Sequence, residues 1–200
     1  NFTPLGLYAP VKRSLDVVIT VLMLPFLILL GIVIALVIVI YSPGPVFFQQ
    51  ERVGYLGKPF SMFKFRTMHS GDVNPSTRFA EENDSRITKV GRLLRRTRLD
   101  ELPQFWNVLK GEMSIIGPRP EQQVFAERFT EAIPFYGFRH TVKPGITGWA
   151  QVKSGYAADE DQTRIKLEYD FFYIKYLSLW LEVIILVKTI GTIVFGKGAR

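Results

Sequence analysis

The chain begins with a long apolar stretch. Residues 17–40 contain no charged side chain and a single hydroxyl group, that of Thr20. As an α-helix rising about 1.5 Å per residue, the stretch would be about 36 Å long, enough to cross a hydrocarbon core of about 30 Å. A core helix of a soluble protein is rarely apolar on every side. The pattern therefore predicts a membrane helix.

Basic residues flank this stretch on both sides, namely Lys12 and Arg13 before it and Arg52, Lys58, Lys64 and Arg66 after it. By the positive-inside rule both flanks face the cytoplasm, which does not fit a single crossing. Pro25 lies within the stretch, where it removes a helical hydrogen bond and bends the helix. We therefore expect a re-entrant helix that dips into the membrane and returns to the same face, with a plain span as the alternative.

An alternating pattern follows the apolar stretch. Residues 46–53 and 60–67 are rich in aromatic and branched side chains, and glycines and a proline separate the two runs. Such a pair predicts a β-hairpin. In its second strand, alternation places Phe63 and Phe65 on one face and Lys64 on the other. An ordinary exposed lysine and a functional lysine both fit Lys64.

Helical periodicity returns at residues 85–98, which combine an apolar stripe with a basic side. The stripe consists of Ile87, Val90 and Leu94, with Leu93 alongside it, and the basic side consists of Arg86, Lys89, Arg92 and Arg96. Such a helix can lie on anionic headgroups. The polar residues 71–84 before it show no pattern and predict a mobile loop.

The rest of the chain alternates short helical patterns with turns. Helices are predicted over residues 102–109, 121–132 and 159–176, the first with Phe105, Trp106 and Leu109 as buried anchors. Gly145 and Gly148 mark a tight loop whose backbone can approach a ligand closely. Residues 177–195 are apolar apart from Glu182, Lys188 and a few hydroxyl groups, and with Trp180 they suit a helix in the plane of the membrane surface.

Composition narrows the possible chemistry. The 200 residues carry a formal net charge of +7 and include no cysteine. Without thiols, disulfides, cysteine-ligated zinc and cysteine nucleophiles are excluded. The excess of positive charge indicates an anionic partner such as nucleic acid, an acidic membrane face or a phosphorylated substrate. The apolar stretch favours the membrane and a substrate found there.

Two adjacent carboxylates, Asp100 and Glu101, are the main candidates for chemistry. A Gly-Pro-Arg-Pro turn with Arg119 follows them, and they are preceded by Arg86, Lys89, Arg92, Arg95, Arg96 and Arg98. Arginine forms forked contacts with phosphate oxygens, and an acid pair suits a divalent metal or a nucleophile, so the segment indicates phosphoryl chemistry. The structural alternative is that Asp100 caps a helix beginning near Glu101 and the arginines form a solvated face.

The run LDELPQFWNVLKGEMSIIGPRP at residues 99–120 and the run KPGITGWAQV at residues 143–152 resemble the bacterial sugar transferases grouped as monotopic phosphoglycosyl transferases. The resemblance extends from residue 12 to the end of the chain. It implies that Asp100 is a nucleophile that forms a phosphosugar intermediate and that Glu101 holds Mg²⁺. The family's other site residues match Lys64, Arg95, Arg119 and Asp170. Both arginines would hold phosphates, and Asp170 is a candidate third acid and metal ligand.

The resemblance also implies a reaction. A phosphosugar would pass from a nucleotide diphosphate sugar, expected to be a UDP-sugar, to polyprenyl (undecaprenyl) phosphate, with release of the nucleoside monophosphate. This step would initiate a surface polysaccharide or glycoconjugate at the cytoplasmic face of the bacterial inner membrane. The expected partners are the two substrates and the lipid bilayer, without nucleic acid, and a homodimer is a candidate assembly.

Two other hypotheses stay open from the residues alone. The chain could be a membrane-tethered basic module that binds anionic lipid or nucleic acid without catalysis. Alternatively, it could be an enzyme of direct displacement in which both acids hold metal only.

These patterns and the resemblance predict an α+β fold, mostly helical. It would have an N-terminal re-entrant membrane helix, a small β-hairpin, and amphipathic interfacial helices around one catalytic core. We assign residues 1–42 to the juxtamembrane segment and membrane helix. Residues 43–200 would form a catalytic domain at the cytoplasmic face that includes the C-terminal interfacial helix.

Overall fold

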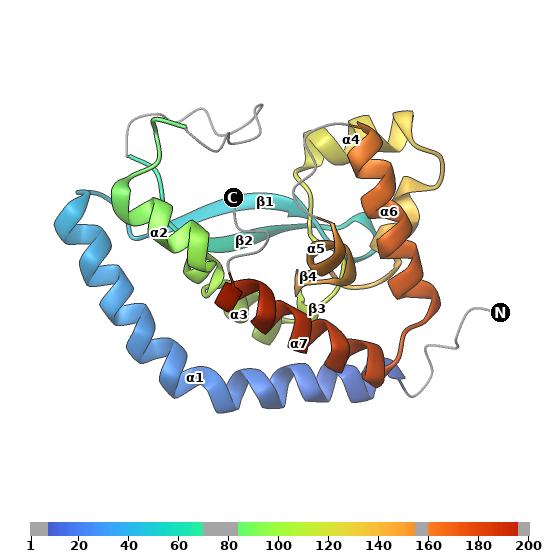
Figure 1. The fold of residues 1–200 in the computed structure, drawn as a ribbon, viewed down its shortest axis with the longest axis horizontal. Coiled ribbons are helices and arrows are strands. Elements are labelled where there is room, and N and C mark those ends of the chain that lie inside the picture. Colours follow the sequence, from blue (N-terminus) through green and yellow to red (C-terminus); the bar gives the residue numbers. More distant parts are fainter. Residues whose placement is uncertain (1–7, 70–83, 155–159, 196–200) are drawn as a thin grey trace.

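The computed structural model describes residues 8–69, 84–154 and 160–195. Along the chain the elements are α1 (Tyr8–Tyr41), β1 (Phe47–Val53), η1 (Tyr55–Gly57), β2 (Pro59–Phe65), α2 (Lys89–Thr97), η2 (Leu99–Glu101), α3 (Gln104–Lys110), β3 (Ser114–Ile116), α4 (Gln123–Ala132), η3 (Tyr136–Thr141), β4 (Gly145–Thr147), α5 (Trp149–Lys153), α6 (Glu160–Lys175) and α7 (Leu179–Phe195). Figure 1 shows α1 along one side of the molecule, the β1–β2 hairpin across the middle, and α4 and α6 together at one end. A mostly helical chain with a small β-hairpin is thus confirmed.

Helix α1 carries the apolar stretch. The helix bends in its middle part in Figure 1, and Pro25 lies inside it. In the part of the chain that the structure describes, it is the one helix long and apolar enough to cross a membrane. The rest of the protein leaves its large apolar side chains uncovered, since Leu22 is 76% exposed and Ile40 is 74% exposed. Its surface therefore suits membrane association.

The first turns of α1 are polar and are fixed to the rest of the chain. Arg13 donates to the carbonyl oxygens of Val108 (2.5 Å) and Leu109 (2.8 Å) near the C-terminal end of α3. A cation is favourable there because the last helical carbonyls lack partners. Lys12 pairs with Glu182 of α7 at 2.5 Å. These contacts join α1 to α3 and α7.

The predicted β-hairpin is present, with Phe47 opposite Phe65 and Val53 opposite Pro59 in antiparallel register. Phe65 is buried in a cluster with residues of α1 and α2. Lys64 lies in the same strand, and only 16% of its side chain is exposed. It is therefore not an ordinary exposed strand lysine.

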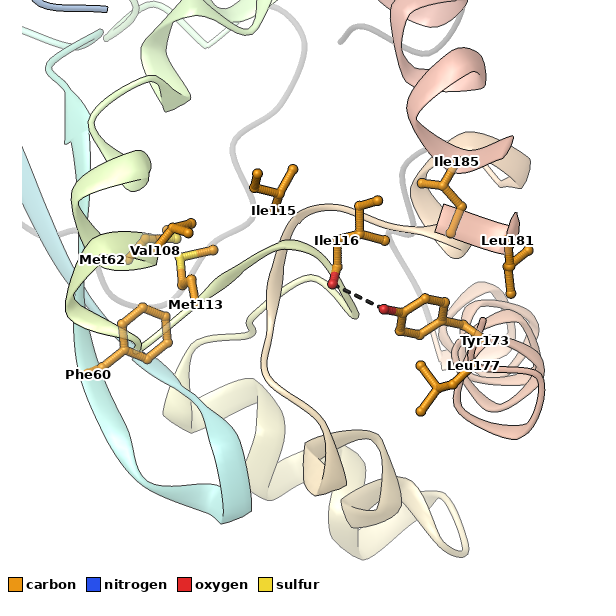
Figure 2. Close-up of a cluster of buried hydrophobic side chains, with 10 residues drawn as sticks. All are labelled: Phe60, Met62, Val108, Met113, Ile115, Ile116, Tyr173, Leu177, Leu181 and Ile185. Carbon is orange, nitrogen blue, oxygen red and sulfur yellow. Dashed lines mark hydrogen bonds between the residues drawn. The ribbon is translucent and has the colours of Figure 1, made fainter. Parts of the chain in front are cut away.

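The largest hydrophobic cluster connects the hairpin side of the molecule to its C-terminal helices (Figure 2). Its buried members are Phe60, Met62, Val108, Met113, Ile115, Ile116, Tyr173, Leu177, Leu181 and Ile185. The hydroxyl group of Tyr173 on α6 donates to the carbonyl oxygen of Ile116 at 3.2 Å (Figure 2). Strand β3 is thus held between α3 and the pair α6 and α7.

Strands β3 and β4 form a short parallel pair in which glycines let two backbone segments meet. A Cβ atom on Gly145 would lie 2.0 Å from the nitrogen of Gly117, and one on Gly148 would lie 2.2 Å from the oxygen of Gly117. We expected these glycines to admit a ligand. The close approach that the structure shows is to the chain's own backbone, so the glycines position the segment that carries Arg119.

Helix α2 begins at Lys89, later than the predicted start at residue 85. The reason is a cap, because the hydroxyl oxygen of Thr88 accepts a hydrogen bond from the backbone N–H of Gly91 at 2.8 Å. Leu94 is buried as the stripe predicts, whereas Leu93 is 60% exposed.

Helix α3 ends at Lys110 and is stopped, as predicted, at Gly111, which has a φ of 83°. The prediction that Trp106 is a buried anchor is wrong, since Trp106 is 57% exposed. The buried face carries Gln104, Asn107 and Val108 instead. The hairpin offers main-chain partners to Asn107, whose side-chain oxygen accepts from the backbone N–H of Phe63 at 3.1 Å and whose side-chain nitrogen donates to the carbonyl oxygen of Ser61 at 2.8 Å.

The other predicted helices appear as α4, α6 and α7, with ends shifted by one or two residues. The predicted loop at 71–84 lies outside the described residues except for Asp84.

A glycine inside α2 gives a test of this packing. A Cβ atom on Gly91 would lie 2.0 Å from the carbonyl oxygen of Thr67. We expect Gly91→Ala to lower the free energy of unfolding by about 1–3 kcal/mol through overpacking. The control is Gly191→Ala in α7, where no described atom outside the neighbouring helix backbone lies within 4 Å of the new Cβ. Thermal unfolding in detergent measures both variants. Equal melting temperatures for the two variants would contradict this packing.

Candidate active site

The acid pair lies in a short 3-10 turn between two helices. Helix α2 ends at Thr97, and Arg98 then adopts a left-handed conformation with φ 56° and ψ 17°. The turn η2 follows, and Asp100 and Glu101 within it are both buried. The chain reverses here because left-handed backbone ends a helix sharply.

Asp100 is not the N-cap of α3. The capping position belongs to Pro103, and no side chain caps this helix. The structural alternative for Asp100 is therefore wrong, because η2 separates it from the start of α3. A buried carboxyl group that caps nothing needs another explanation.

Glu101 is bound by two cations from different parts of the chain. Its Oε1 atom lies 2.7 Å from Nη2 of Arg119 and 3.3 Å from Nζ of Lys64. Burial alone would raise the pKa of Glu101, but Arg119 and Lys64 outweigh burial and hold it well below its usual range. Glu101 is therefore ionised at neutral pH.

Asp100 has the same cations nearby, but its pKa is shifted in the opposite direction to that of Glu101. Its carboxylate makes no hydrogen bond within the described residues, and only 7% of the residue is exposed. Burial raises the pKa of Asp100, Lys64 opposes that rise, and the adjacent Glu101 charge adds to it. Two neighbouring carboxyl groups with pKa values moved in opposite directions indicate two different roles.

Two arginines complete the cationic surroundings. Arg95 donates from Nε to the hydroxyl group of Thr67 at 2.9 Å, and its charge lowers the pKa of Asp100. Arg98 acts electrostatically on Glu101 and Asp100, and burial lowers its own pKa. Sequence reasoning placed Arg98 in the basic segment but not in the site, because its left-handed backbone has no sequence signal in a non-glycine residue.

Asp170 has its own partner. It is 2% exposed, and its Oδ2 atom accepts hydrogen bonds from Nε (3.0 Å) and Nη2 (2.8 Å) of Arg139. The structure thus brings Lys64 and Arg119 into contact with Glu101, places Arg95 within electrostatic range of Asp100, and pairs Asp170 with Arg139.

The described residues offer few ligands for a metal ion. Within the described ranges no group of three or more His, Cys, Asp or Glu side chains could hold a metal ion. Mg²⁺ commonly takes one or two carboxylates and completes its shell with substrate phosphates and water. Asp100 and Glu101 lie in one turn, and one or both of their carboxylates fit that mode, with the substrate providing the remaining ligands.

Chemically, the site can bind an anion next to a carboxylate. Lys64, Arg95, Arg98 and Arg119 provide positive charge, and Glu101 neutralises only part of it. A phosphate group entering here would meet cations first, and the side chain of Asp100 would lie near it without a hydrogen-bond partner of its own.

Comparisons with known proteins show what this chain is similar to. The family model described as "Bacterial sugar transferase" matches residues 7–196. The chain is 52% identical over 200 residues to the UDP-N-acetylgalactosamine-undecaprenyl-phosphate N-acetylgalactosaminephosphotransferase of Aeromonas hydrophila, covering all of this chain and 47% of that protein. It is 44% identical over 192 residues to the UDP-glucose:undecaprenyl-phosphate glucose-1-phosphate transferase of Escherichia coli, covering 94% of this chain and 41% of that protein. A Caulobacter vibrioides protein with the same name as the E. coli one is 40% identical over 190 residues, with 94% and 71% covered.

Because the pKa values of Asp100 and Glu101 are shifted in opposite directions, replacing each acid by its amide should have opposite effects on the free energy of unfolding. The folded protein raises the pKa of Asp100 above its ordinary value of 3.8, so ionised Asp100 costs folding free energy at neutral pH. We expect Asp100→Asn to stabilise the protein by about 0.5–2 kcal/mol at pH 7, and this gain should vanish as the pH falls toward 3.8.

Glu101→Gln should instead destabilise the protein by about 3 kcal/mol at pH 7, because Lys64 and Arg119 lose their partner. Thermal unfolding of both variants between pH 4 and pH 7 provides the measurement. A loss of stability in Asp100→Asn at pH 7 would contradict this electrostatic description.

Proposed function

Because the chain belongs to the bacterial sugar transferase family, we propose that it transfers a sugar phosphate from a UDP-sugar to undecaprenyl phosphate and releases UMP. The single observation that carries the proposal is the state of Asp100, a buried carboxyl group without a hydrogen-bond partner in the described structure, surrounded by cations. The chain spans about half the length, or less, of the first two relatives above. Those relatives name different sugars, so the proposal stops at the class of UDP-sugars.

The cations near Asp100 reduce the repulsion between its carboxylate and a phosphate group. A carboxylate 4 Å from one phosphate charge meets a repulsion of about 4 kcal/mol at an effective dielectric constant of about 20. Arg119 and Lys64 both contact Glu101, so their positive charges lie beside the acid pair. We infer that the diphosphate binds over Arg95, Arg98, Arg119 and Lys64, which offset this repulsion.

We assign the nucleophile to Asp100. One of its oxygens attacks the phosphorus next to the sugar, the bond between that phosphorus and the bridging oxygen breaks, and UMP leaves with the bridging oxygen. An oxygen of undecaprenyl phosphate then attacks the same phosphorus and displaces Asp100. Glu101 would hold Mg²⁺ together with substrate oxygens, and the bound ion would neutralise phosphate charge.

The membrane assignment rests on two exposed apolar surfaces. One is α1, and the other is the face of α7 that includes Trp180, Val187 and Ile190, which are 73%, 65% and 62% exposed. The contact between Lys12 and Glu182 joins the two helices. We propose that α1 is re-entrant at its bend and that α7 lies in the headgroup plane, on the cytoplasmic face. The enzyme would then meet its lipid substrate by lateral diffusion and start a surface glycan.

The covalent step predicts an intermediate on Asp100. Brief exposure of the full chain in detergent to a UDP-sugar without lipid substrate should add the mass of a sugar phosphate to the peptide that contains Asp100. Asp100→Asn should abolish the adduct and lower turnover by at least about 10³-fold, as expected for loss of a nucleophile. Mass spectrometry and UMP release provide the measurements.

Near-normal turnover in a folded Asp100→Asn variant would contradict the nucleophile assignment. Sequential kinetics without any adduct in the wild-type protein would favour direct displacement. If no donor is cleaved and binding to anionic vesicles is indifferent to Asp100 and Glu101, the chain is a membrane-binding module.

At Arg98, the contribution of the side-chain charge can be tested separately from that of the left-handed backbone. Glycine accepts the left-handed conformation of residue 98 without strain, so Arg98→Gly should keep the turn and remove the cation. We expect the KM for the UDP-sugar to rise about tenfold, because one contact to a charged group is lost. The control is Arg96→Ala, which removes an exposed cation of α2. Equal KM values for the two variants would remove Arg98 from the binding site.

A further inference from the structure

The segment that carries Arg119 depends on contacts made by its carbonyl groups. It lies between β3 and α4 without regular secondary structure, and its two prolines have no N–H groups. The oxygen of Pro118 accepts from the N–H of Gly145 at 3.0 Å, and the oxygen of Pro120 accepts from Nη1 of Arg52 at 3.3 Å. Each contact comes from a different element.

The carbonyl oxygen of Arg119 itself is held by Arg139. Nη2 of Arg139 donates to this oxygen at 3.0 Å. The same guanidinium donates to Asp170 from Nε and Nη2, and Nη1 donates to the hydroxyl group of Tyr136 at 2.8 Å. Arg139, Asp170 and Tyr136 are 7%, 2% and 1% exposed. The three side chains therefore form a hydrogen-bonded network in the protein interior.

The negative charge of Asp170 balances the positive charge of Arg139 in this network. A lone guanidinium in the interior would be costly, and Asp170 supplies the opposing charge. Burial alone would lower the pKa of Arg139, but Tyr136 and Asp170 outweigh burial and raise it. Arg139 thus stays charged at the place where it binds the main chain of Arg119.

We propose that Arg139 and Asp170 are positioning residues that fix the main chain of Arg119 and thereby hold its guanidinium against Glu101. Asp170 then acts through Arg139 and not as a metal ligand. Within the described residues, the hydrogen bonds to its carboxylate come from Arg139 alone. The kinetic consequence rests on the proposed function, but the structural one does not.

The structural test is carbodiimide labelling of Glu101, followed by mass spectrometry of the full chain in detergent near pH 6. Carbodiimide must reach a carboxyl group to react with it, and Arg119 and Lys64 enclose Glu101, which is 6% exposed. We expect little labelling in the wild-type protein and several-fold more in Asp170→Asn and Arg139→Lys, because a displaced Arg119 side chain uncovers Glu101. Arg119→Gln is the positive control.

The matched control is Glu182→Gln, which removes a buried acid from a different ion pair, that with Lys12. It should leave the labelling of Glu101 unchanged. Because Asp170→Asn leaves Arg139 unpaired in the interior, the double variant Arg139→Gln with Asp170→Asn is the second arm. It leaves no lone charge and replaces the forked contact by a single amide, so labelling of Glu101 should still rise.

Kinetics separate positioning from metal binding. If the wild-type protein cleaves a UDP-sugar, Asp170→Asn and Arg139→Lys should each lower kcat by about 10²-fold, the effect of misplacing a charged group by about 1 Å. The Mg²⁺ concentration for half-maximal rate should not change. Unchanged labelling of Glu101 in folded Asp170→Asn would overturn the proposal, and a higher Mg²⁺ requirement with unchanged labelling would make Asp170 a metal ligand. If no donor is cleaved, the proposed function fails while the labelling still decides this inference.

Discussion

The ion pair between Glu101 and Arg119 is the interaction on which the site depends. Two adjacent carboxyl groups in the interior cannot both be ionised unless cations lie close to them. Arg119 and Lys64 satisfy Glu101 by direct contact, and Asp100 is left in the same field without a hydrogen-bond partner in the described structure. One acid therefore fixes the cations, and the other remains available to a ligand.

This division requires unusual backbone on both sides. Arg98 has a positive φ, which is rare for a residue with a side chain, and it turns the chain from α2 into η2. On the other side, Arg119 stands between two prolines, and Gly117 lets β4 pass within contact distance. Strained or tightly packed backbone of this kind persists only where the surrounding structure enforces it, and it is concentrated at functional sites.

The same core fixes the apolar helix relative to the acid pair. Arg13 binds the carbonyl groups at the end of α3, and α3 begins just after Glu101. The buried amide of Asn107 in turn joins α3 to β2, the strand of Lys64. A displacement of α1 would therefore also move the acid pair, because the short helix α3 connects the two. This explains why polar residues occupy the first turns of an otherwise apolar helix.

The sequence by itself determined the apolar helix, the hairpin, the helix stop at Gly111 and the two adjacent carboxyl groups of Asp100 and Glu101. These features are local, since they depend on periodicity, turn residues and neighbouring charges. Tertiary structure alone decided that Asp100 caps nothing, that Trp106 is exposed, and that Asp170 pairs with Arg139. It also brought Arg98 into the site. Those outcomes depend on which partners distant segments bring to a buried polar group, and one-dimensional spacing does not contain that information.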